Sequence, residues 1–482
     1  MINDIPRLPL ICPVSALAPP PGLFDEIVAQ GWLMKGWVGT NVPAPGFVSR
    51  KGYQGKMVAR HARVRSQQRL CLLALFAGLP ALASCAGSLA SPLAQDSSSP
   101  KSEHNRSIRS DANSDNDGPP ANFRSLYGFQ GGTDGGYPAA DLLNVNGVFY
   151  GTTSGFQTCG TVFTITTAGI ETVVHDFEGY DGCASLASLI DVGGNLYGTT
   201  SQGGTGCDGG CGTVFEISAS GGFSVIYNFK GGQDGQHPVA GLTYLDGILY
   251  GTTTNGGKYS EGTIFALQPS GGETVLHSFG GSDDGIEPSA ALTAVNGELY
   301  GTTAEGGKGK RARGTVFMLT TSGSERVLHT FSKKGDCGGP LASLISVGST
   351  LYGTTEEGGA NNEGCVYSVT LSGRKKATES VLYSFLPNGS GDGNEPTSDL
   401  LYLNGVLYGT TLYGGNGGGT VFQVTTSGLE TVLYGFSSAN SPIAGVTDSD
   451  GVLYGTTFFG GTKDLGTVFA LTPAYSPAQV GR

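Results

Sequence analysis

The sequence predicts an all-β fold: a seven-bladed β-propeller built from four-stranded antiparallel blades. Three observations predict it. The phrase YGTT recurs at intervals of about 50 residues, each repeat unit divides into four strand-like runs, and the repeat region begins and ends with partial units. A period near 50 with four short strands per unit is typical of a propeller blade. The seven copies begin at Tyr150, Tyr197, Tyr250, Tyr300, Tyr352, Tyr408 and Tyr454.

The unit over residues 288–331 illustrates the four runs. PSAALTAV is small and apolar, ELYGTT and GTVFMLT follow, and ERVLHTF ends the unit. Between the first two runs, Asn296-Gly297 tolerates the positive φ angles of a two-residue hairpin, and Ser322-Gly323 supplies a second short turn. The strands are therefore expected to form a meander. The first run, with a small residue near its centre, is expected to lie at the crowded axis of the ring.

The incomplete ends of the repeat region distinguish a ring from an open solenoid. FRSLYGF at residues 123–129 matches a fourth strand, and GTVFALT at residues 466–472 matches a third strand. Together they complete one blade, so the first strand is expected to pair with the last blade. An open β-solenoid, the alternative, would need polar caps, whereas closure removes exposed sheet edges. We expect the propeller over residues 123–473 and a tail over residues 474–482.

The segment before the repeats has the character of a targeting sequence. Residues 57–85 read MVARHARVRSQQRLCLLALFAGLPALASC, with arginines, then a short apolar run, then small residues before Cys85. This order is typical of a secretory signal peptide, and its end resembles the lipobox of bacterial lipoproteins. The resemblance implies that residues 57–84 are removed and that Cys85 carries a lipid anchor. The alternative is an ordinary signal peptide with a chance cysteine nearby.

Two further segments are not expected to fold. Residues 1–56 share nothing with the repeats and are expected to be a non-native, unstructured upstream extension. Residues 85–122 are rich in Ser, Asp, Asn and Pro. Such a segment cannot bury enough apolar surface to offset the entropy of ordering, so a disordered tether is expected.

The charge balance excludes some partners. The formal net charge is −12, and the acidic excess lies after residue 84. An acidic surface repels phosphate backbones and anionic headgroups. We therefore expect no nucleic-acid partner, contact with a membrane through the lipid alone, and a monomer.

In a meander blade, the loops after the second and fourth strands emerge on one face. We call this the long-loop face, and variable loops on a rigid ring are the usual place for binding. An aspartate recurs there, expected either to cap its own turn or to contribute to an acidic ring for Ca²⁺ or cationic groups. A basic loop, KGKRARG at 308–314, is expected to be solvated, to bind an anion or to pair with neighbouring loops. The candidate ligand-face residues are Asp134, Asp181, Asp234, Asp284, Asp336, Asp392, Lys308, Lys310, Arg311 and Arg313.

Histidines and cysteines give further candidates. His175, His277 and His329 occupy a fourth-strand position that holds tyrosine elsewhere, which indicates packing; a metal role is disfavoured because the three would lie on different blades. The six cysteines after Cys85 are even in number, which favours disulfides outside the cytoplasm. We expect Cys337–Cys365, and Cys183 with Cys207 or Cys211. Cys159 is the remaining candidate.

The phrase set LYGTT…GG…GTVF…SG.E.VLH.F resembles the GloVer repeat of "choice-of-anchor" tandem-repeat proteins, which bacteria export. The resemblance covers about residues 123–472, and it implies attachment to the cell envelope facing the periplasm or the exterior. It implies no established activity and no catalytic residues. No cofactor is expected beyond the Ca²⁺ possibility.

Three functions remain open. The first is a binding or interaction scaffold with an unknown protein or glycan ligand on the long-loop face. The second is an extracytoplasmic enzyme acting on polysaccharide, which a pair of carboxylates in an axial pocket would favour. The third is a structural cell-surface component. No G-x-S-x-G, P-loop or histidine-based metal motif is present, so an enzyme is the less favoured reading.

Overall fold

The computed structural model describes residues 122–155, 157–372, 377–437 and 440–473. The expected upstream extension, the signal peptide with Cys85, the tether up to residue 121 and the tail from residue 474 lie outside these residues. The part of the chain that is described contains no helix with the length and hydrophobicity needed to span a bilayer.

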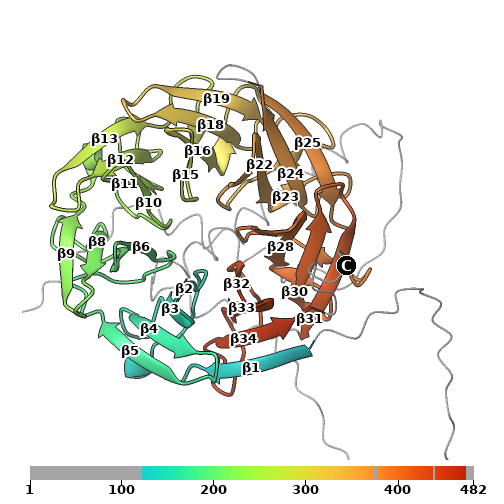
Figure 1. The fold of residues 1–482 in the computed structure, drawn as a ribbon. Coiled ribbons are helices and arrows are strands. Elements are labelled where there is room, and N and C mark those ends of the chain that lie inside the picture. Colours follow the sequence, from blue (N-terminus) through green and yellow to red (C-terminus); the bar gives the residue numbers. More distant parts are fainter. Residues whose placement is uncertain (1–121, 156, 373–376, 438–439, 474–482) are drawn as a thin grey trace, which may run out of the picture. The chain divides into compact units, whose positions relative to one another are not determined.

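In the described residues the strands form seven four-stranded antiparallel sheets around a common axis (Figure 1). Blades 1 to 7 are numbered along the chain, and the first strand of each lies nearest the axis. The first strands are β2 (Leu143–Val145), β6 (Ile190–Val192), β10 (Thr243–Leu245), β15 (Thr293–Val295), β21 (Ile345–Val347), β27 (Leu401–Leu403) and β32 (Val446–Ser449). The second strands, which carry YGTT, are β3 (Val148–Thr152), β7 (Asn195–Thr200), β11 (Ile248–Thr253), β16 (Glu298–Thr303), β22 (Thr350–Thr355), β28 (Val406–Thr411) and β33 (Val452–Thr457).

The two outer strands of each blade follow in the same order. The third strands are β4 (Thr161–Thr166), β8 (Thr213–Ile217), β12 (Thr263–Leu267), β18 (Thr315–Thr320), β24 (Cys365–Leu371), β30 (Gly417–Thr425) and β34 (Thr467–Thr472). The fourth strands are β5 (Glu171–Asp176), β9 (Phe223–Asn228), β13 (Glu273–Ser278), β19 (Glu325–Thr330), β25 (Ala377–Ser384), β31 (Glu430–Ser437) and, in blade 7, β1 (Asn122–Gly128). The predicted propeller is therefore confirmed.

The ring closes as the sequence predicts. Strand β1 pairs antiparallel with β34, with Phe123 opposite Leu471 and Tyr127 opposite Val468. The resulting order in blade 7 is β1-β34-β33-β32, so the first described strand completes the last sheet (Figure 1). An open solenoid is excluded.

Turn chemistry explains the hairpins between first and second strands. Asn296 and Gly297 have φ angles of 53° and 79°, the positive values that a type I′ turn requires at both central residues. Asparagine and aspartate adopt this conformation at lower cost than other side chains, and glycine adopts it freely. The face that carries these hairpins consequently has short connections.

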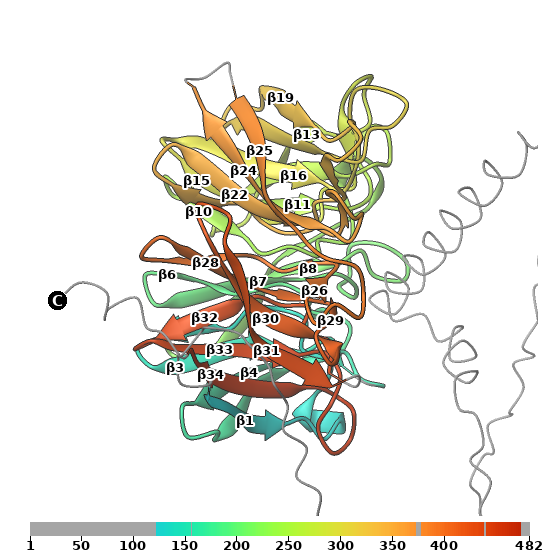
Figure 2. The ribbon, with the colours of Figure 1, turned by 90° about the vertical axis from the view of Figure 1, so that its right-hand side faces the viewer.

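Longer connections lie on the opposite, long-loop face. Three small sheets join the segment entering a blade to the loop after its second strand. They pair β14 (Gly285–Ile286) with β17 (Glu305–Gly306), β20 (Cys337–Gly338) with β23 (Glu357–Gly358), and β26 (Gly393–Asn394) with β29 (Tyr413–Gly414). Two short 3-10 helices, η3 (Gly132–Asp134) and η4 (Gly232–Asp234), lie in equivalent loops. In side view β26 and β29 lie toward the side of the ring opposite β10 and β15 (Figure 2).

The core lies between neighbouring blades. At each of the seven interfaces an aromatic ring at or just after the end of the fourth strand meets an aromatic ring on the third strand of the next blade, with ring centroids 5.1–5.3 Å apart. Phe229 and Phe265 are one edge-to-face pair, and both are fully buried. Edge-to-face pairs of this kind contribute about 0.5–1.5 kcal/mol beyond the burial of their area. The repeated phenylalanines therefore hold each blade against the next.

The first threonine of YGTT also ties neighbouring blades together. Thr302 Oγ1 donates a hydrogen bond to the carbonyl oxygen of Ala342 in the next blade, at 3.2 Å. The ring repeats this bond down to its closure, where Thr456 Oγ1 is 3.5 Å from the carbonyl oxygen of Ala140. The acceptor is the small residue expected at the axis, because a larger side chain there would keep the blades apart.

Candidate functional site

The candidate aspartates lie in the loops that follow the fourth strands. Each carboxylate accepts a hydrogen bond from a backbone N–H of its own loop. In blade 7, Asp134 Oδ2 accepts from the N–H of Gln130 at 2.5 Å, and in blade 5 Asp392 Oδ2 accepts from the N–H of Leu386 at 2.9 Å. These loops are thereby fixed by their own aspartate, as in other side-chain-capped turns.

The same aspartates contact the tyrosine or histidine of the fourth strand. Tyr127 donates from its hydroxyl to Asp134 at 2.6 Å and Tyr383 to Asp392 at 2.7 Å. His175 Nε2 lies 2.8 Å from Asp181 Oδ2. Burial, and then the hydrogen bond to the aspartate, raises the pKa of both tyrosines, so their hydroxyls stay protonated as donors. The six aspartates therefore belong to separate clusters on six of the seven blades and do not converge on one ion.

Sequence reasoning missed the third member of these clusters. A residue at or near the start of the next fourth strand, a glutamate at five interfaces, faces the aspartate across the blade boundary. Burial, and then the neighbouring aspartate, raises the pKa of Glu171 to about 7 and of Glu430 to about 8. The signal was the E of SG.E.VLH, which recurs in the repeat phrase. The five glutamates are Glu171, Glu273, Glu325, Glu379 and Glu430.

At the two remaining interfaces phenylalanine replaces the glutamate. The ring of Phe223 stacks on His175, with centroids 3.5 Å apart. Phe123 stacks on Tyr434, with centroids 4.1 Å apart. At these two interfaces a stacked phenylalanine ring occupies the position of the glutamate side chain. Either an apolar ring or a carboxylate can therefore pack at this position.

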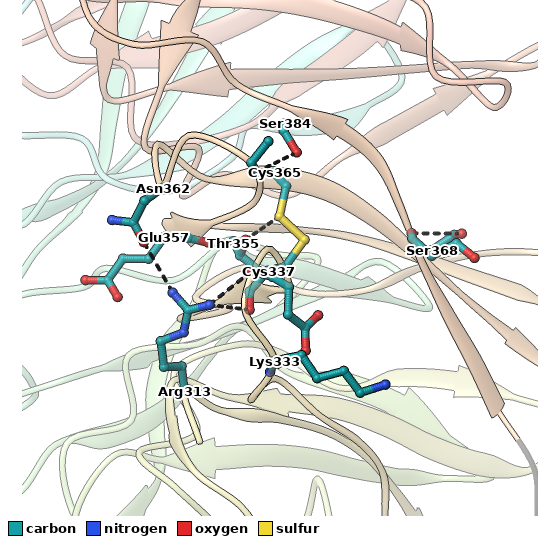
Figure 3. The surroundings of a disulfide bond; sticks show 12 residues. Arg313, Lys333, Cys337, Thr355, Glu357, Asn362, Cys365, Ser368 and Ser384 are labelled. Carbon is teal, nitrogen blue, oxygen red and sulfur yellow. Dashed lines mark hydrogen bonds between the residues drawn. A yellow bond between two sulfur atoms is a disulfide. The ribbon is translucent and has the colours of Figure 1, made fainter. Parts of the chain in front are cut away.

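The basic loop 308–314 divides into exposed and anchored residues. Lys308, Lys310 and Arg311 are exposed, and Lys308 Nζ lies 3.7 Å from a carboxylate oxygen of Asp283, with both side chains more than half exposed. Arg313 instead donates to the carbonyl oxygens of Asp336 and Cys337, at 3.0 and 3.2 Å. Figure 3 shows this guanidinium beside the Cys337–Cys365 disulfide. Arg313 therefore braces the entry to blade 5, whereas the exposed cations remain open to solvent.

All six candidate cysteines form disulfides on the long-loop face. Cys337 and Cys365 are bonded as expected and join the entry of blade 5 to its third strand (Figure 3). The expected pairing of Cys183 with Cys207 or Cys211 is wrong. Cys183 bonds to Cys159, and Cys207 bonds to Cys211 within one loop.

The Cys159–Cys183 pairing arises because the segment that enters each blade packs against the preceding blade. The carbonyl oxygen of Cys159, just before the third strand of blade 1, accepts a hydrogen bond from the N–H of Ala184 at 2.9 Å. This contact places the entry of blade 2 against the preceding blade, so the cysteine nearest Cys183 lies one blade back. The Cys159–Cys183 bond consequently links two blades, whereas Cys207–Cys211 closes a loop inside blade 2.

A cavity of about 330 Å³ lies among the residues that lead into the first strands, close to the axis. Its lining includes two aspartates, Asp141 of blade 1 and Asp399 of blade 6, and the serines Ser188 and Ser343. Asp141 Oδ1 accepts from the N–H of Gly445 at 2.5 Å, and Asp399 Oδ1 accepts from the N–H of Ser343 at 2.6 Å. The two carboxylates thus bridge neighbouring blades while lining one cavity.

The pKa values of Asp141 and Asp399 are both raised above the usual value for aspartate. Burial, and then the charge of Asp399, raises the pKa of Asp141. Burial likewise raises the pKa of Asp399. One of two buried carboxylates that share a cavity is favoured in the protonated form, because two buried like charges repel. Neither aspartate was among the residues singled out from the sequence, since the equivalent position holds serine, glycine or alanine in the other blades.

Three tyrosines expose their rings in loops of the long-loop face. Tyr180, Tyr259 and Tyr413 are 64%, 45% and 38% exposed, whereas the tyrosines of the YGTT phrase, such as Tyr300, are mostly buried. Lys258 Nζ lies 4.9 Å from the ring centre of its neighbour Tyr259. Exposed tyrosine combines apolar area with a polar hydroxyl, the combination enriched at binding surfaces.

Comparison with known proteins identifies a repeat family and a shared fold. A family model described as the Gloeobacter/Verrucomicrobia repeat matches residues 117–312 and 296–480. No curated protein matches the sequence. The disulfides together with a bacterial repeat family point to a protein located outside the cytoplasm.

Solved structures with a similar fold have low identity. A sialidase from Trypanosoma rangeli has 14% identity and a TM-score of 0.40, with 73% of this chain and 59% of that chain covered. PorZ, a surface component of the type-IX secretion system of Porphyromonas gingivalis, has 13% identity and a TM-score of 0.43, covering 70% and 47%. A putative gluconolactonase has 13% identity and a TM-score of 0.34, covering 54% and 81%. Likenesses at this level carry no argument about activity.

Proposed function

This chain belongs to the Gloeobacter/Verrucomicrobia repeat family, and from that premise we propose that it is an extracytoplasmic binding scaffold whose long-loop face holds a protein or glycan ligand. The observation that carries the proposal is the position of the disulfides. All three lie in or next to the loops of that face, whereas the opposite face of the described ring is built from short turns. Cross-linked loops are preorganised, which lowers the entropic cost of binding.

The exposed tyrosines add support. Tyr180, Tyr259 and Tyr413 come from loops of the same face, and exposed aromatic rings are candidates for ligand contact. The expected ligand contact is therefore made by loop tips on a rigid ring and needs no movement of the blades.

A glycan array and a pull-down with the purified protein test this function. Binding that Tyr180→Ala or Tyr259→Ala weakens by about tenfold or more would support it. Ile170→Ala is the matched control, because Ile170 is 65% exposed but lies in a short turn between third and fourth strands. Blank results in both screens, or equal losses in Ile170→Ala, would contradict the proposal.

Attachment to a membrane is a separate part of the proposal. We propose that Cys85 carries the lipid, because basic, apolar and small residues precede it in the order of a lipoprotein signal. Labelling with radioactive palmitate in a bacterial host should mark the protein, and Cys85→Ser should abolish the label. Persistence of the label in that variant would place the lipid elsewhere.

A second candidate function rests on the axial cavity. Asp141 and Asp399 line one cavity, and a pair of carboxylates of which one is protonated is the equipment of a glycoside-cleaving enzyme. Against this, both carboxylates accept hydrogen bonds from backbone N–H groups of neighbouring blades, a role in blade packing that needs no catalysis. Screening for polysaccharide hydrolysis, with Asp141→Asn expected to lower the rate at least 100-fold, decides the point. Hydrolysis that is unaffected in Asp141→Asn would remove the axial pair from consideration.

A further inference from the structure

Two neighbouring interfaces bring a histidine, an aspartate and a glutamate together. In each trio the histidine and the aspartate come from one blade, and the glutamate from the fourth strand of the next. The potential ligand atoms of a trio all lie within 4.8 Å of one another. The trios are His277, Asp284 and Glu325 between blades 3 and 4, and His329, Asp336 and Glu379 between blades 4 and 5. Blade 4 is thus flanked by a trio on both sides.

Buried polar atoms in both trios have no hydrogen-bond partner within the described structure. These atoms are Oε1 of Glu325, Oε1 of Glu379 and Nε2 of His329. His329 Nε2 lies 3.6 Å from Asp336 Oδ2, which is too far for a hydrogen bond. Buried polar groups are normally satisfied. Unpaired glutamate oxygens occur at the other interfaces too, at Glu171, Glu273 and Glu430. The distinctive atom is His329 Nε2, which lacks a partner close to the unpaired Oε1 of Glu379 and indicates a group that the protein chain itself does not supply.

We propose that each trio binds one Zn²⁺ ion, which links blade 4 to both of its neighbours. Imidazole nitrogen and carboxylate oxygen are ordinary zinc ligands, whereas Ca²⁺ takes oxygen ligands. The His277 Nε2–Asp284 Oδ2 distance is 3.1 Å and the His329 Nε2–Asp336 Oδ2 distance is 3.6 Å. These values bracket the separation of about 3.3 Å between two ligands of a tetrahedral zinc ion.

Charge and access also fit a divalent cation. Two carboxylates and a neutral imidazole carry a charge of −2, which the ion neutralises. Three protein ligands leave the fourth position of a tetrahedral ion to water. The side chains of His277 and His329 are 20% and 17% exposed, so both trios lie near the surface of the ring.

The other interfaces show what the same position does without a trio. Where tyrosine replaces histidine, its hydroxyl contacts both carboxylates: Tyr227 donates to Asp234 at 2.5 Å and lies 3.4 Å from Glu273 Oε2. Oε1 of Glu273 has no hydrogen-bond partner in the described residues. Where histidine is kept but the glutamate is replaced, the ring of Phe223 covers His175. Neither arrangement offers a third ligand next to an imidazole. The interfaces of Tyr227 and His175 therefore serve as internal controls for the two trios.

The test measures zinc bound to the purified protein after removal of metal with a chelator, addition of Zn²⁺ and dialysis. Mass-spectrometric metal analysis should show one fewer ion per chain in His277→Tyr and in His329→Tyr than in the unaltered protein, and two fewer in the double variant. Comparing variants cancels ions bound elsewhere on the chain. His175→Tyr is the matched control and should leave the amount of bound zinc unchanged.

The substitutions copy arrangements that the protein already uses. Histidine to tyrosine reproduces the interface of Tyr227, and Glu325→Phe reproduces the stack of Phe223 on His175, so both are expected to fold. Zn²⁺ should raise the melting temperature of the unaltered protein and of His175→Tyr but not of the double variant. Equal zinc content in all these proteins, or an equal loss in His175→Tyr, would overturn the proposal.

If the variants fail to fold, chemical modification of the histidines in the unaltered protein tests whether the two trios bind zinc. Diethyl pyrocarbonate modifies accessible imidazoles, and mass spectrometry locates the modified residues. Zn²⁺ should protect His277 and His329 at least fivefold and leave the modification of His175 unchanged. Equal modification of all three with and without Zn²⁺ would reject the two sites.

Discussion

Gly301 lies directly beneath the ring of Phe317 on the neighbouring strand: a Cβ built on Gly301 would come within 2.5 Å of Phe317 Cζ and 2.8 Å of Leu292 Cδ2. A methyl group therefore has no room at this position. The same close approach to the third-strand aromatic ring occurs at the glycine of every other YGTT copy, namely Gly151, Gly198, Gly251, Gly353, Gly409 and Gly455. The glycine of YGTT and the aromatic residue of GTVF are thus two halves of one packing unit.

Gly301→Ala should lower the free energy of unfolding by about 1–3 kcal/mol, because the added methyl group overpacks the blade. Guanidinium denaturation followed by circular dichroism measures the effect. Gly281→Ala is the control, since a Cβ there would have its nearest neighbour at 3.8 Å, an ordinary contact. Equal midpoints for the two variants would contradict the packing argument.

Most of the fold could be predicted because its determinants are local and repeated. The turn residues Asn296-Gly297 predict the hairpin, and the seven copies of YGTT predict seven blades. The partial units at residues 123–129 and 466–472 set the closure. Each of these signals depends on residues close together in the sequence or on repetition. A single sequence is therefore enough to recognise them.

The candidate site was harder to predict because it lies across blade boundaries. Asp284 and His277 belong to one repeat, but their partner Glu325 belongs to the next, and nothing in the spacing of one repeat shows that offset. The Cys159–Cys183 bond was missed for the same reason. The sequence showed which residues recur, whereas the lateral shift between neighbouring blades decides which of them meet.

Loss of the disulfide between blades should destabilise the protein more than loss of the one within a loop. Cys159–Cys183 spans 24 residues and Cys207–Cys211 spans 4. In the loop-entropy account these closures contribute about 3.5 and about 2 kcal/mol. The melting temperatures of Cys159→Ser/Cys183→Ser and Cys207→Ser/Cys211→Ser proteins test the order. A larger loss in the second variant would show that chain entropy does not govern these bonds.

Stability should fall as the pH rises from about 4.5 to about 8. Burial and then the Asp392 carboxylate raise the pKa of Glu430 from 4.5 to about 8 in the folded protein. Folded protein therefore holds a proton in this window that the unfolded chain releases, and the stabilisation is complete below pH 4.5 and lost above pH 8. The slope is at most about 1.4 kcal/mol per pH unit for one group.

Glu430→Gln should remove this share of the pH dependence, because the amide does not titrate. Urea denaturation at pH 5, 6.5 and 8 measures it, with the exposed residue Glu305 changed to Gln as the control. If the two variants keep the same slope as the unaltered protein, Glu430 does not hold a proton in the folded state.

The closing strand β1 should be the weakest outer strand of the ring, because among the described residues the chain continues from it on one side alone. The ring of Phe123 stacks on Tyr434 at 4.1 Å and meets Phe436 edge-on at 5.6 Å. Phe123→Ala should lower the free energy of unfolding by about 3 kcal/mol and let β1 separate from β34, so that the amides of β34 exchange with deuterium faster.

Phe223→Ala is the control, because it removes the equivalent ring in blade 2, where strand β9 is continuous with the blades on both sides. Fast exchange should then stay confined to blade 7, because local opening follows the element with the fewest connections. Equal acceleration in β8 of the Phe223→Ala protein would show that closure is no weaker than the continuous blades.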